Sequence, residues 1–418
     1  MATQTDNQPP RPRIEVVDAL RGFAVMAIIL LHNIEHFNLY SSQELSSGFM
    51  AAIDKGVWDS LFFLFSGKAY AIFALLFGFS FFIQDSNQAR KGKDFRPRFA
   101  WRLVLLFLLG TFNAIFFPGE ILVLYAILGF VLIPVCRLSN RWLLLIATVL
   151  MLQPMGWGKY IYAVMHPDYQ EGVAAWRLHA QELYPALMQS NMWETFRVNL
   201  YHGQLFSHLW AWDHGRFFQT SALFMFGLWL GREGLFVRLA DHRVFWKRVA
   251  LVGAICFVPL YFITDALPQW VERGEEFSPL NTICSSLRNF AFMSLLVSLF
   301  IACWQMEGWQ KLLRKLVPYG KMSLTNYITQ SIVGSFIYFG YGLSLYDDLG
   351  AAASFALGIV LFLLQISFCH WWLNHHKQGP FEALWRKATW IGAQLRRLST
   401  VRYVLKLSKE RKRVCDRY

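Results

Sequence analysis

Charged residues are scarce in this sequence. Asp, Glu, Lys and Arg make up 16% of its 418 residues, whereas about 25% is usual in a soluble domain. Hydrophobic residues make up 55%, and the mean hydropathy is +0.33. This composition excludes an ordinary soluble domain and predicts an all-α, polytopic membrane protein embedded in the lipid bilayer.

Cysteine is also rare, with six residues in the chain. Most of them fall in apolar runs, none lies in a segment predicted outside the cytoplasm, and no C-x-x-C spacing occurs. A disulfide framework and a zinc site are therefore not expected, and no metal ligand is assigned. A cleavable signal peptide is not predicted either, because the first apolar run is too long and Glu35 and His36 follow it.

Long apolar runs are plentiful, and a run of about 20 residues is long enough to cross a bilayer as a helix. They predict ten transmembrane helices, at about 16–38, 60–83, 99–117, 120–136, 141–157, 214–231, 248–266, 281–303, 322–340 and 350–373.

The net charge of +13 is placed asymmetrically. The basic residues fall in the tail and in those loops that share a side with both termini, whereas acidic residues collect on the other side. Both termini are therefore predicted to be cytoplasmic. The basic residues do not line a groove with interleaved aromatic residues, so no nucleic-acid partner is expected.

These spans divide the chain into five parts. They are a disordered tail (1–13), the first five spans (14–157), an extracytoplasmic segment (158–213), the last five spans (214–373) and a basic cytoplasmic tail (374–418).

Two of these parts lie outside the predicted bilayer. The segment 158–213 is rich in Trp and His, and Pro185 and the polar break at Ser190 predict two amphipathic helices on the outer leaflet. Interfacial anchoring explains them better than a lid over an outward-facing site. The tail ends in LRRLSTVRYVLKLSKERKRVCDRY, a pattern typical of a basic amphipathic helix lying on anionic lipid.

The first span contains Asp18, Arg21 and His32, which an apolar helix rarely carries without a functional reason. At about 100° per residue, Arg21 and His32 differ by only about 20° around the helix, and Asp18 and His32 by about 40°. All three therefore lie on one face, with His32 about 16 Å beyond Arg21. Asp18, one turn below Arg21, is positioned to hold its guanidinium.

Three further cations lie inside predicted spans: Lys68, Arg216 and Arg288. Their positions place them in the outer half of the bilayer, close to the depth of His32. A buried cation requires a partner. One interpretation is internal pairing with acidic residues (Asp59, Glu120, Asp213 or Asp265), and the other is a pocket for a phosphate or carboxylate group.

A neutral imidazole near its ordinary pKa is a suitable general base. His32 is predicted to take the proton of a hydroxyl or amine that attacks an activated acyl carbon. Arg21 would then bind the anionic end of a donor, and the alternative is that neighbouring helices satisfy both side chains.

Other classes of function remain open from the residues alone. His32-Asn33-Ile34-Glu35-His36 matches the zinc-peptidase pattern H-x-x-E-H, but no third ligand is evident. A transporter or efflux protein for a small anionic solute would also place ions inside the bilayer. A non-catalytic scaffold is a third class, and homo-oligomerisation is left open.

The opening DALRGFAVMAIILLHN resembles the start of the transmembrane acyltransferase superfamily, whose first span carries an Arg, ten residues and a His. That group includes the lysosomal heparan-alpha-glucosaminide N-acetyltransferase-like and bacterial O-acyltransferase-like families. Three longer stretches resemble the YeiB-like bacterial inner-membrane proteins: GKAYAIFALLFGFSF (67–81), YGKMSLTNYITQS (319–331) and GPFEALWRKATW (379–390).

This resemblance implies a multi-pass protein of the bacterial inner membrane. It also implies transfer of an acyl group from a cytoplasmic thioester to an extracytoplasmic or membrane acceptor. Acyl-coenzyme A would be the donor substrate, with no bound cofactor.

Overall fold

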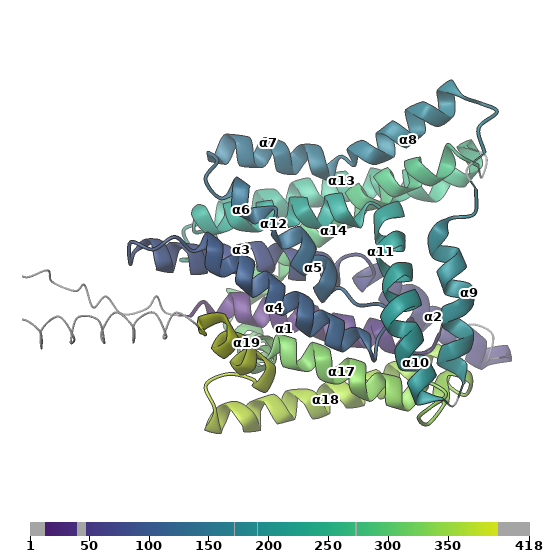
Figure 1. Cartoon of the computed structure of the whole chain (residues 1–418). Helices are drawn as coiled ribbons and strands as arrows, with labels where there is room; N and C mark the ends of the chain where they lie inside the picture. The colour runs from purple at the N-terminus through teal and green to yellow at the C-terminus, as the bar shows by residue number, and fades with distance from the viewer. Residues whose placement is uncertain (1–12, 40–46, 171, 190, 272–273, 392–418) are drawn as a thin grey trace, which may run out of the picture.

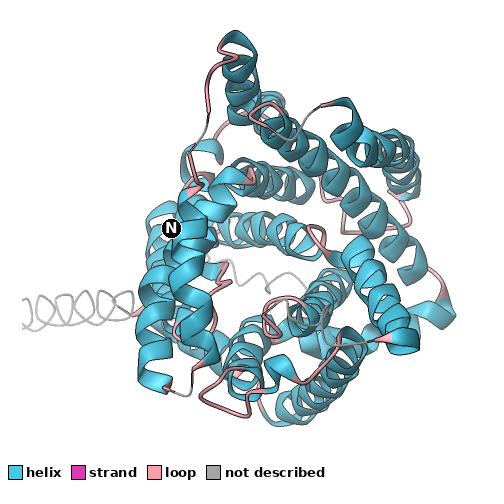
Figure 2. Cartoon of the chain, turned by 90° about the vertical axis from the view of Figure 1, so that its right-hand side faces the viewer, coloured by secondary structure: helices cyan, strands magenta, loops and turns pink. Residues whose placement is uncertain are grey.

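The computed structural model describes residues 13–39, 47–170, 172–189, 191–271 and 274–391. Across these ranges the chain is helical and contains no strand (Figure 2). The predicted disordered tail, except for Arg13, and the predicted lipid-binding helix beyond residue 391 lie outside the described residues. The first half of the described chain forms α1 (Glu15–Ile34), α2 (Gly48–Phe65), α3 (Ala69–Ala89), α4 (Arg96–Ala114), α5 (Leu122–Gly129), α6 (Leu132–Val135), α7 (Asn140–Met151), α8 (Pro154–Met165), α9 (Ala175–Met188), α10 (Met192–Val198) and α11 (Gln204–Asp213).

The second half contains longer helices. These are α12 (Arg216–Arg232), α13 (Arg243–Trp270), α14 (Phe277–Trp304), α15 (Glu307–Leu313), α16 (Val317–Lys321), α17 (Ser323–Tyr338), α18 (Ala351–His375) and α19 (Pro380–Trp390).

Helix α1 lies at the centre of the bundle, where it contacts α2, α3, α16, α17 and α18 (Figure 1). In its most apolar stretch 78% of the residues are buried, compared with 6% in α13, which lies at the periphery. A helix that is apolar all round is expected in an interior. The central position of α1 therefore forces its three charged or titratable side chains to find partners or cavities inside the protein.

Among the described residues, five segments are long and apolar enough to cross a membrane: α1, the segment Gly48–Ala89 that contains α2 and α3, α13, α14 and α18. The other predicted spans correspond to shorter or divided helices. Residues 120–136 form α5 and α6, and residues 141–157 fall on α7 and α8, which are separated by a left-handed Gln153 (φ 58°). The Gln153 side chain donates hydrogen bonds to the Gly215 carbonyl and the Ser286 hydroxyl, which fixes this break.

The predicted span 60–83 is also broken, between Phe65 and Ala69. Gly67 has a φ of 74°, in the left-handed region that favours glycine, and a Cβ there would lie 2.4 Å from the Asn289 side chain. The apolar runs on both sides are equally hydrophobic, so hydropathy does not reveal the break. Broken helices inside membranes are tolerated where they line a cavity.

The described part of the segment 158–213 is helical, and its interruption agrees with the predicted polar break, since α9 ends at Met188 and α10 begins at Met192. Pro185 lies inside α9, and the chain leaves the helix only after Met188. From Met192 the chain continues through α10, a π-helical turn (Asn199–Gly203) and α11. Helix α9 buries Leu183 and Leu187 in a cluster with Phe37, which follows α1, and Tyr338 at the C-terminal end of α17, so it packs on the protein.

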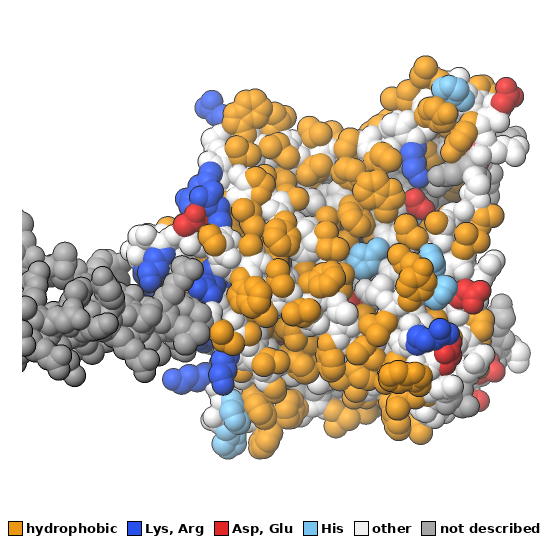
Figure 3. All heavy atoms as spheres, in the orientation of Figure 1, with side chains coloured by type: hydrophobic (Ala, Val, Ile, Leu, Met, Phe, Trp, Pro, Cys, Tyr) orange, Lys and Arg blue, Asp and Glu red, His pale blue; other side chains and the backbone are white. Residues whose placement is uncertain are grey.

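The surface is divided by charge, as Figure 3 shows. Lys and Arg gather mostly at one end of the molecule, Asp and Glu mostly at the other, and hydrophobic side chains cover the region between. The first of these ends carries the start of α1, the start of α4, and α19; we call it the basic end (Arg13, Arg96, Arg98 and Arg386). This distribution is typical of a membrane protein.

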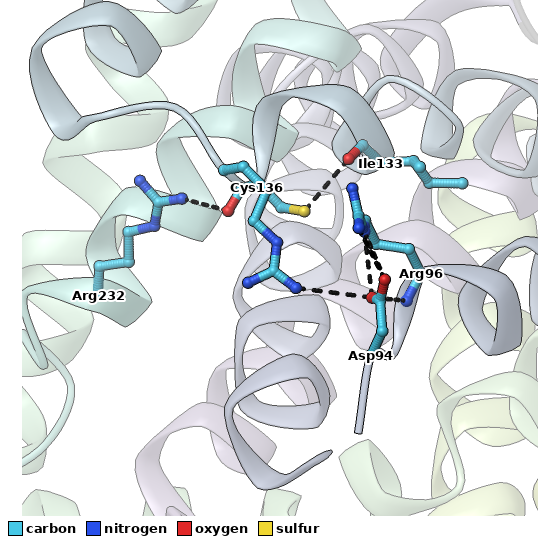
Figure 4. Close-up of polar contacts among 6 residues, drawn as sticks. Asp94, Arg96, Ile133, Cys136 and Arg232 are labelled. Atoms are coloured by element: carbon cyan, nitrogen blue, oxygen red, sulfur yellow. Dashed lines mark hydrogen bonds and ion pairs between the residues drawn. The ribbon is translucent and has the colours of Figure 1, made fainter. Parts of the chain in front are cut away.

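Polar contacts at the basic end join α4, α6 and α12 (Figure 4). The Arg232 guanidinium donates hydrogen bonds to the carbonyls of Cys136 and Leu138, which would otherwise be unpaired after α6 ends. Asp94 accepts hydrogen bonds from the backbone N–H and the side chain of Arg96, where α4 begins, and lies 3.6 Å from Arg137. The charges at this end therefore fix the ends of three helices.

The Arg96 hydrogen bonds lower the pKa of Asp94 to about 2, from about 3.9 in an unfolded chain. A lowered pKa in the folded state stabilises the protein above pH 4, and this contribution disappears as the pH falls through about 2. We expect Asp94→Asn to lower the Tm slightly at pH 7 and to match the wild type near pH 2. Thermal unfolding in detergent between pH 2 and pH 7 tests this prediction. A Tm difference between variant and wild type that does not change with pH would contradict it.

Candidate functional site

The three residues predicted to share a face of α1 do so, and two of them interact directly. Arg21 Nη1 lies 3.0 Å from Asp18 Oδ1, and its Nη2 donates to Ser80 Oγ of α3 at 2.9 Å. Arg13 Nε lies 2.8 Å from the other Asp18 oxygen. The buried Asp18 carboxylate is thus held between two guanidinium groups, and with Ser80 it fixes the direction of Arg21.

Arg21 lines a cavity of about 300 Å³ at the basic end, which we call the basic cavity. Side chains of α1, α3, α4, α17 and α19 form its walls. Of the described residues, five cations and a single acid, Glu382, line it; the cations are Arg13, Arg21, Arg102, Lys321 and Arg386. Such an excess of positive charge favours an anionic ligand.

His32 lines a second cavity, of about 180 Å³, which we call the histidine cavity. Most of its wall is apolar, and the polar or charged groups that line it include Glu35, His36, Glu120 and Arg216. The His32 ring packs against Phe117, with ring centroids 4.7 Å apart. Its buried Nδ1 has no hydrogen-bond partner among the residues that the structure describes, so this nitrogen is available to a ligand.

Tyr327 of α17 lines both cavities and lies between them. Its hydroxyl oxygen is 3.4 Å from the backbone nitrogen of Ile121, which donates to it. Tyr70 and Tyr125 extend this partition, because the Tyr125 hydroxyl of the basic cavity donates to the Tyr70 carbonyl at 2.7 Å. The two cavities therefore follow one another along α1, with Arg21 in the first and His32 in the second.

The three outer cations do not meet in one cavity. Arg216 lines the histidine cavity, with its guanidinium 4.4 Å from the centre of the Tyr70 ring and 3.2 Å from Gln219 Oε1. Lys68 and Arg288 do not line it: Lys68 Nζ lies 5.5 Å from the Phe292 ring of α14 and donates to the Phe62 carbonyl at 3.4 Å. The break around Gly67 explains this, since it turns Lys68 toward α14 instead of along the α3 face that the cavity uses.

Two of the four acids considered as partners, Asp59 and Asp213, pair with other cations, whereas Asp265 interacts electrostatically with Arg288. Asp59 lies 3.9 Å from Lys55, and Asp213 lies 3.4 Å from Lys159. Within the described ranges, neither acid pairs with Lys68, Arg216 or Arg288. Arg216 instead contacts the rings of Tyr70 and Trp210 and the Gln219 amide, and within the described residues no ion pair joins it to an acid.

Glu120, which the sequence analysis named only as a possible partner of the buried cations, is a cavity residue. Its side chain is buried, lines the histidine cavity, and accepts hydrogen bonds from Asn113 Nδ2 and the backbone N–H of Leu122. The signal was present, since only Pro118 and Gly119 separate two predicted spans here. A connection that short cannot carry an adjacent acid far from the bilayer.

The H-x-x-E-H pattern does not form a metal site in the described part of the chain. Helix α1 ends at Ile34, so His32 and His36 are not successive turns of one helical face. No group of three or more His, Cys, Asp or Glu side chains suited to a metal ion occurs among the described residues.

The fold and its two cavities define a helical membrane protein with ligand-sized spaces inside the bundle. Residues 230–392 match a family model described as "Protein of unknown function (DUF418)". The chain is similar to the uncharacterized protein YxaH of Bacillus subtilis, with 28% identity covering 91% of this chain and 95% of YxaH. It is also similar to the uncharacterized protein YeiB of Escherichia coli, with 25% identity covering 89% of this chain and 95% of YeiB.

A further relative is an uncharacterized 39.9 kDa protein of Bacillus acidopullulyticus, 24% identical over 90% of this chain and 94% of that protein. These similarities support the YeiB-like resemblance and extend over nearly the whole chain. None of these three proteins has a name that states an activity.

Proposed function

We propose that this protein is an integral-membrane acyltransferase. It would move an acyl group from a thioester donor bound at the basic cavity to an acceptor bound in the histidine cavity. The observation that carries the proposal is that Arg21 and His32, on one face of α1, line two cavities that share Tyr327 as a lining residue. Placement in the transmembrane acyltransferase superfamily is part of this proposal.

Arg21 binds the anionic end of the donor, for which acyl-coenzyme A is the expected compound. A guanidinium held by Asp18 and Ser80 loses little freedom on binding, so it provides an oriented cation. The acyl end of the donor reaches toward Tyr327 and the histidine cavity.

His32 acts as the general base. It takes the proton from the acceptor's O–H or N–H as that oxygen or nitrogen bonds to the thioester carbonyl carbon. The C–S bond then breaks, and the thiolate leaves and takes up a proton, so that ester or amide and free thiol are the products. Arg216 is the cation in this cavity and binds an anionic part of the acceptor.

The proposal includes the topology. Ten spans with both termini cytoplasmic, in a bacterial inner membrane, place the basic end and its cavity toward the cytoplasm. The donor then comes from the cytoplasm, and the acceptor comes from the outside or from the membrane.

The donor role of Arg21 predicts a loss of affinity. Hydrogen bonds to charged groups contribute about 1.5–3 kcal/mol, so Arg21→Gln should weaken acetyl-coenzyme A binding by about tenfold or more. Isothermal titration calorimetry on purified protein in detergent measures it, with exposed Arg248→Gln at the start of α13 as the control. Ser80→Ala, which removes one Arg21 contact without changing the charge, should weaken binding less. Equal affinity in Arg21→Gln and the wild type would contradict the donor role.

A transporter for a small anionic solute is the second candidate, and the break between α2 and α3 favours it. Ser66 and Gly67 of that break line the histidine cavity, and interrupted helices commonly form substrate sites in transporters. Release of free thiol from acetyl-coenzyme A by the purified protein separates the two functions, because transport leaves the thioester intact. Anion uptake into proteoliposomes without thiol release would favour the transporter.

A further inference from the structure

We infer that the basic cavity is a binding site for a phosphate-bearing ligand, with Arg102, Lys321 and Arg386 as binding residues beside Arg21. The inference rests on the proposed function for the identity of this ligand as the acyl donor, but not for the phosphate chemistry. Three observations support the inference: the excess of cations in the cavity, the unused hydrogen-bond donors of Arg102, and the contacts that hold α19 in place.

The acids near the cavity pair with only two of its five described cations. Asp18 is already bound by Arg13 and Arg21. Glu382 uses its oxygens on the start of α17, where it accepts from the backbone N–H groups of Leu324 and Thr325 and from the Thr325 hydroxyl. Among the described residues, no ion pair involves Arg102, Lys321 or Arg386, so three cations remain uncompensated around one space.

Arg102 of α4 is held ready for a ligand. Its guanidinium carbon lies 3.8 Å from the centre of the Trp385 ring, a cation–π contact that holds the group in place. The Arg102 Nε is buried and has no hydrogen-bond partner in the described chain, and the one contact of its Nη1 is a long 3.4 Å bond to Thr389 Oγ1. A fixed guanidinium with unused donors suits the bidentate binding of a phosphate.

Helix α19 forms a fixed wall of the cavity. Glu382, Trp385 and Arg386 lie at i, i+3 and i+4, so one face of α19 lines the space. Glu382 attaches the start of α19 to α17, and Trp385 Nε1 donates to the Arg102 carbonyl at 3.1 Å. At the other end, Arg98 donates to the Thr389 carbonyl at 2.7 Å. The ligand-binding side chains are therefore positioned before any ligand arrives.

The size and the remaining walls agree with such a ligand. About 300 Å³ is at the lower end of the range for small-molecule sites. Phe77, Phe99 and Leu106 line the cavity next to the cations. The cavity therefore accommodates an anionic group together with an apolar arm that extends toward Tyr327.

The test is binding of coenzyme A, 3′-dephospho-coenzyme A and pantetheine, which carry decreasing numbers of phosphates, to the full-length protein in detergent. We expect the affinity to fall in that order. Arg102→Gln should weaken coenzyme A at least about tenfold and leave pantetheine unchanged, while Arg141→Gln, an exposed cation of α7, should change neither. If Arg102→Gln does not fold, Lys321→Gln and Arg386→Gln serve in its place. Pantetheine binding as tightly as coenzyme A, or full affinity in the cavity variants, would overturn the inference.

The source of the phosphate is decided by competition in nanodiscs. Displacement of coenzyme A by phosphatidylglycerol but not by phosphatidylcholine would show that the site takes a lipid phosphate headgroup, and no displacement would show a site for the soluble ligand.

The proposed function and the phosphate site can be contradicted separately. Phosphate-dependent binding without any thiol release would support the phosphate site and contradict the acyltransferase proposal. Turnover of a phosphate-free N-acetylcysteamine thioester that is equal in wild type and Arg102→Gln, without coenzyme A binding, would support the acyltransferase and contradict the phosphate site.

Discussion

Replacement of His32 by Gln is expected to lower the rate of thioester turnover by about 100- to 10,000-fold, the usual contribution of a general base. Glutamine keeps a side chain of similar reach but cannot accept the acceptor's proton. The buried Nδ1 of His32, unpaired among the described residues, and the mostly apolar wall of the cavity are the physical reasons to expect so large an effect. The measurement is the release of coenzyme A thiol from acetyl-coenzyme A, with water as the acceptor, by purified protein.

The matched control is His370→Gln. His370 lies on the exposed face of α18, and its Nδ1 contacts the Ile366 carbonyl of its own helix. Its loss should leave turnover and Tm unchanged. A wild-type rate of turnover in His32→Gln, with acetyl-coenzyme A still bound, would contradict the role of His32 as the general base.

Substitution of Gly227 by Leu is expected to prevent folding of the protein. Helices α3 and α12 pack so closely that a Cβ on Gly227 would lie 1.9 Å from the Leu75 carbonyl oxygen, and a Cβ on Gly78 would lie 1.9 Å from that of Phe224. Backbone atoms cannot move away as a side chain can, so the helices would have to separate. Small residues at i and i+4, here Gly227 and Gly231, are typical of close helix pairs in membranes.

The expected result is a small fraction of monodisperse protein in fluorescence-detected size exclusion, and a strongly lowered Tm in whatever remains. Gly158→Leu is the control, because nothing lies within 4 Å of a Cβ at that exposed position of α8. Equal yield and Tm for Gly227→Leu and Gly158→Leu would show that the α3–α12 contact does not limit folding.

Local sequence information predicted the features of the site that depend on the geometry of one helix. The shared face of Asp18, Arg21 and His32 follows from the helical repeat alone, and so does the contact between Asp18 and Arg21. The end of α1 was not predicted correctly, because the predicted span 16–38 runs past Ile34 to include Phe37. Phe37 is buried against Phe117 and Tyr338 after the helix has ended, so hydropathy extended the helix by several residues.

Features that depend on neighbouring helices were not predictable in the same way. Sequence depth placed Lys68, Arg216 and Arg288 together, but the break at Gly67 directs Lys68 to Phe292, and only Arg216 reaches the histidine cavity. Glu120 was considered only as a possible partner of these cations, although the connection between α4 and α5 buries it in the cavity that His32 lines. Depth along a helix is a local quantity, whereas side-chain direction at a break depends on what packs against it.

The sequence by itself determined the class of protein, a helical membrane protein, and the face of α1 on which the acid, the guanidinium and the imidazole lie. Both follow from hydropathy and from a repeat of 3.6 residues, which are properties of residues close together in the chain. Only the tertiary structure decided which side chains share a cavity, such as Arg102 with Trp385 or His32 with Glu120. These pairs come from segments far apart in sequence, and their meeting depends on backbone contacts such as that between Gly78 and Gly227, which set how closely and at which faces the helices pack.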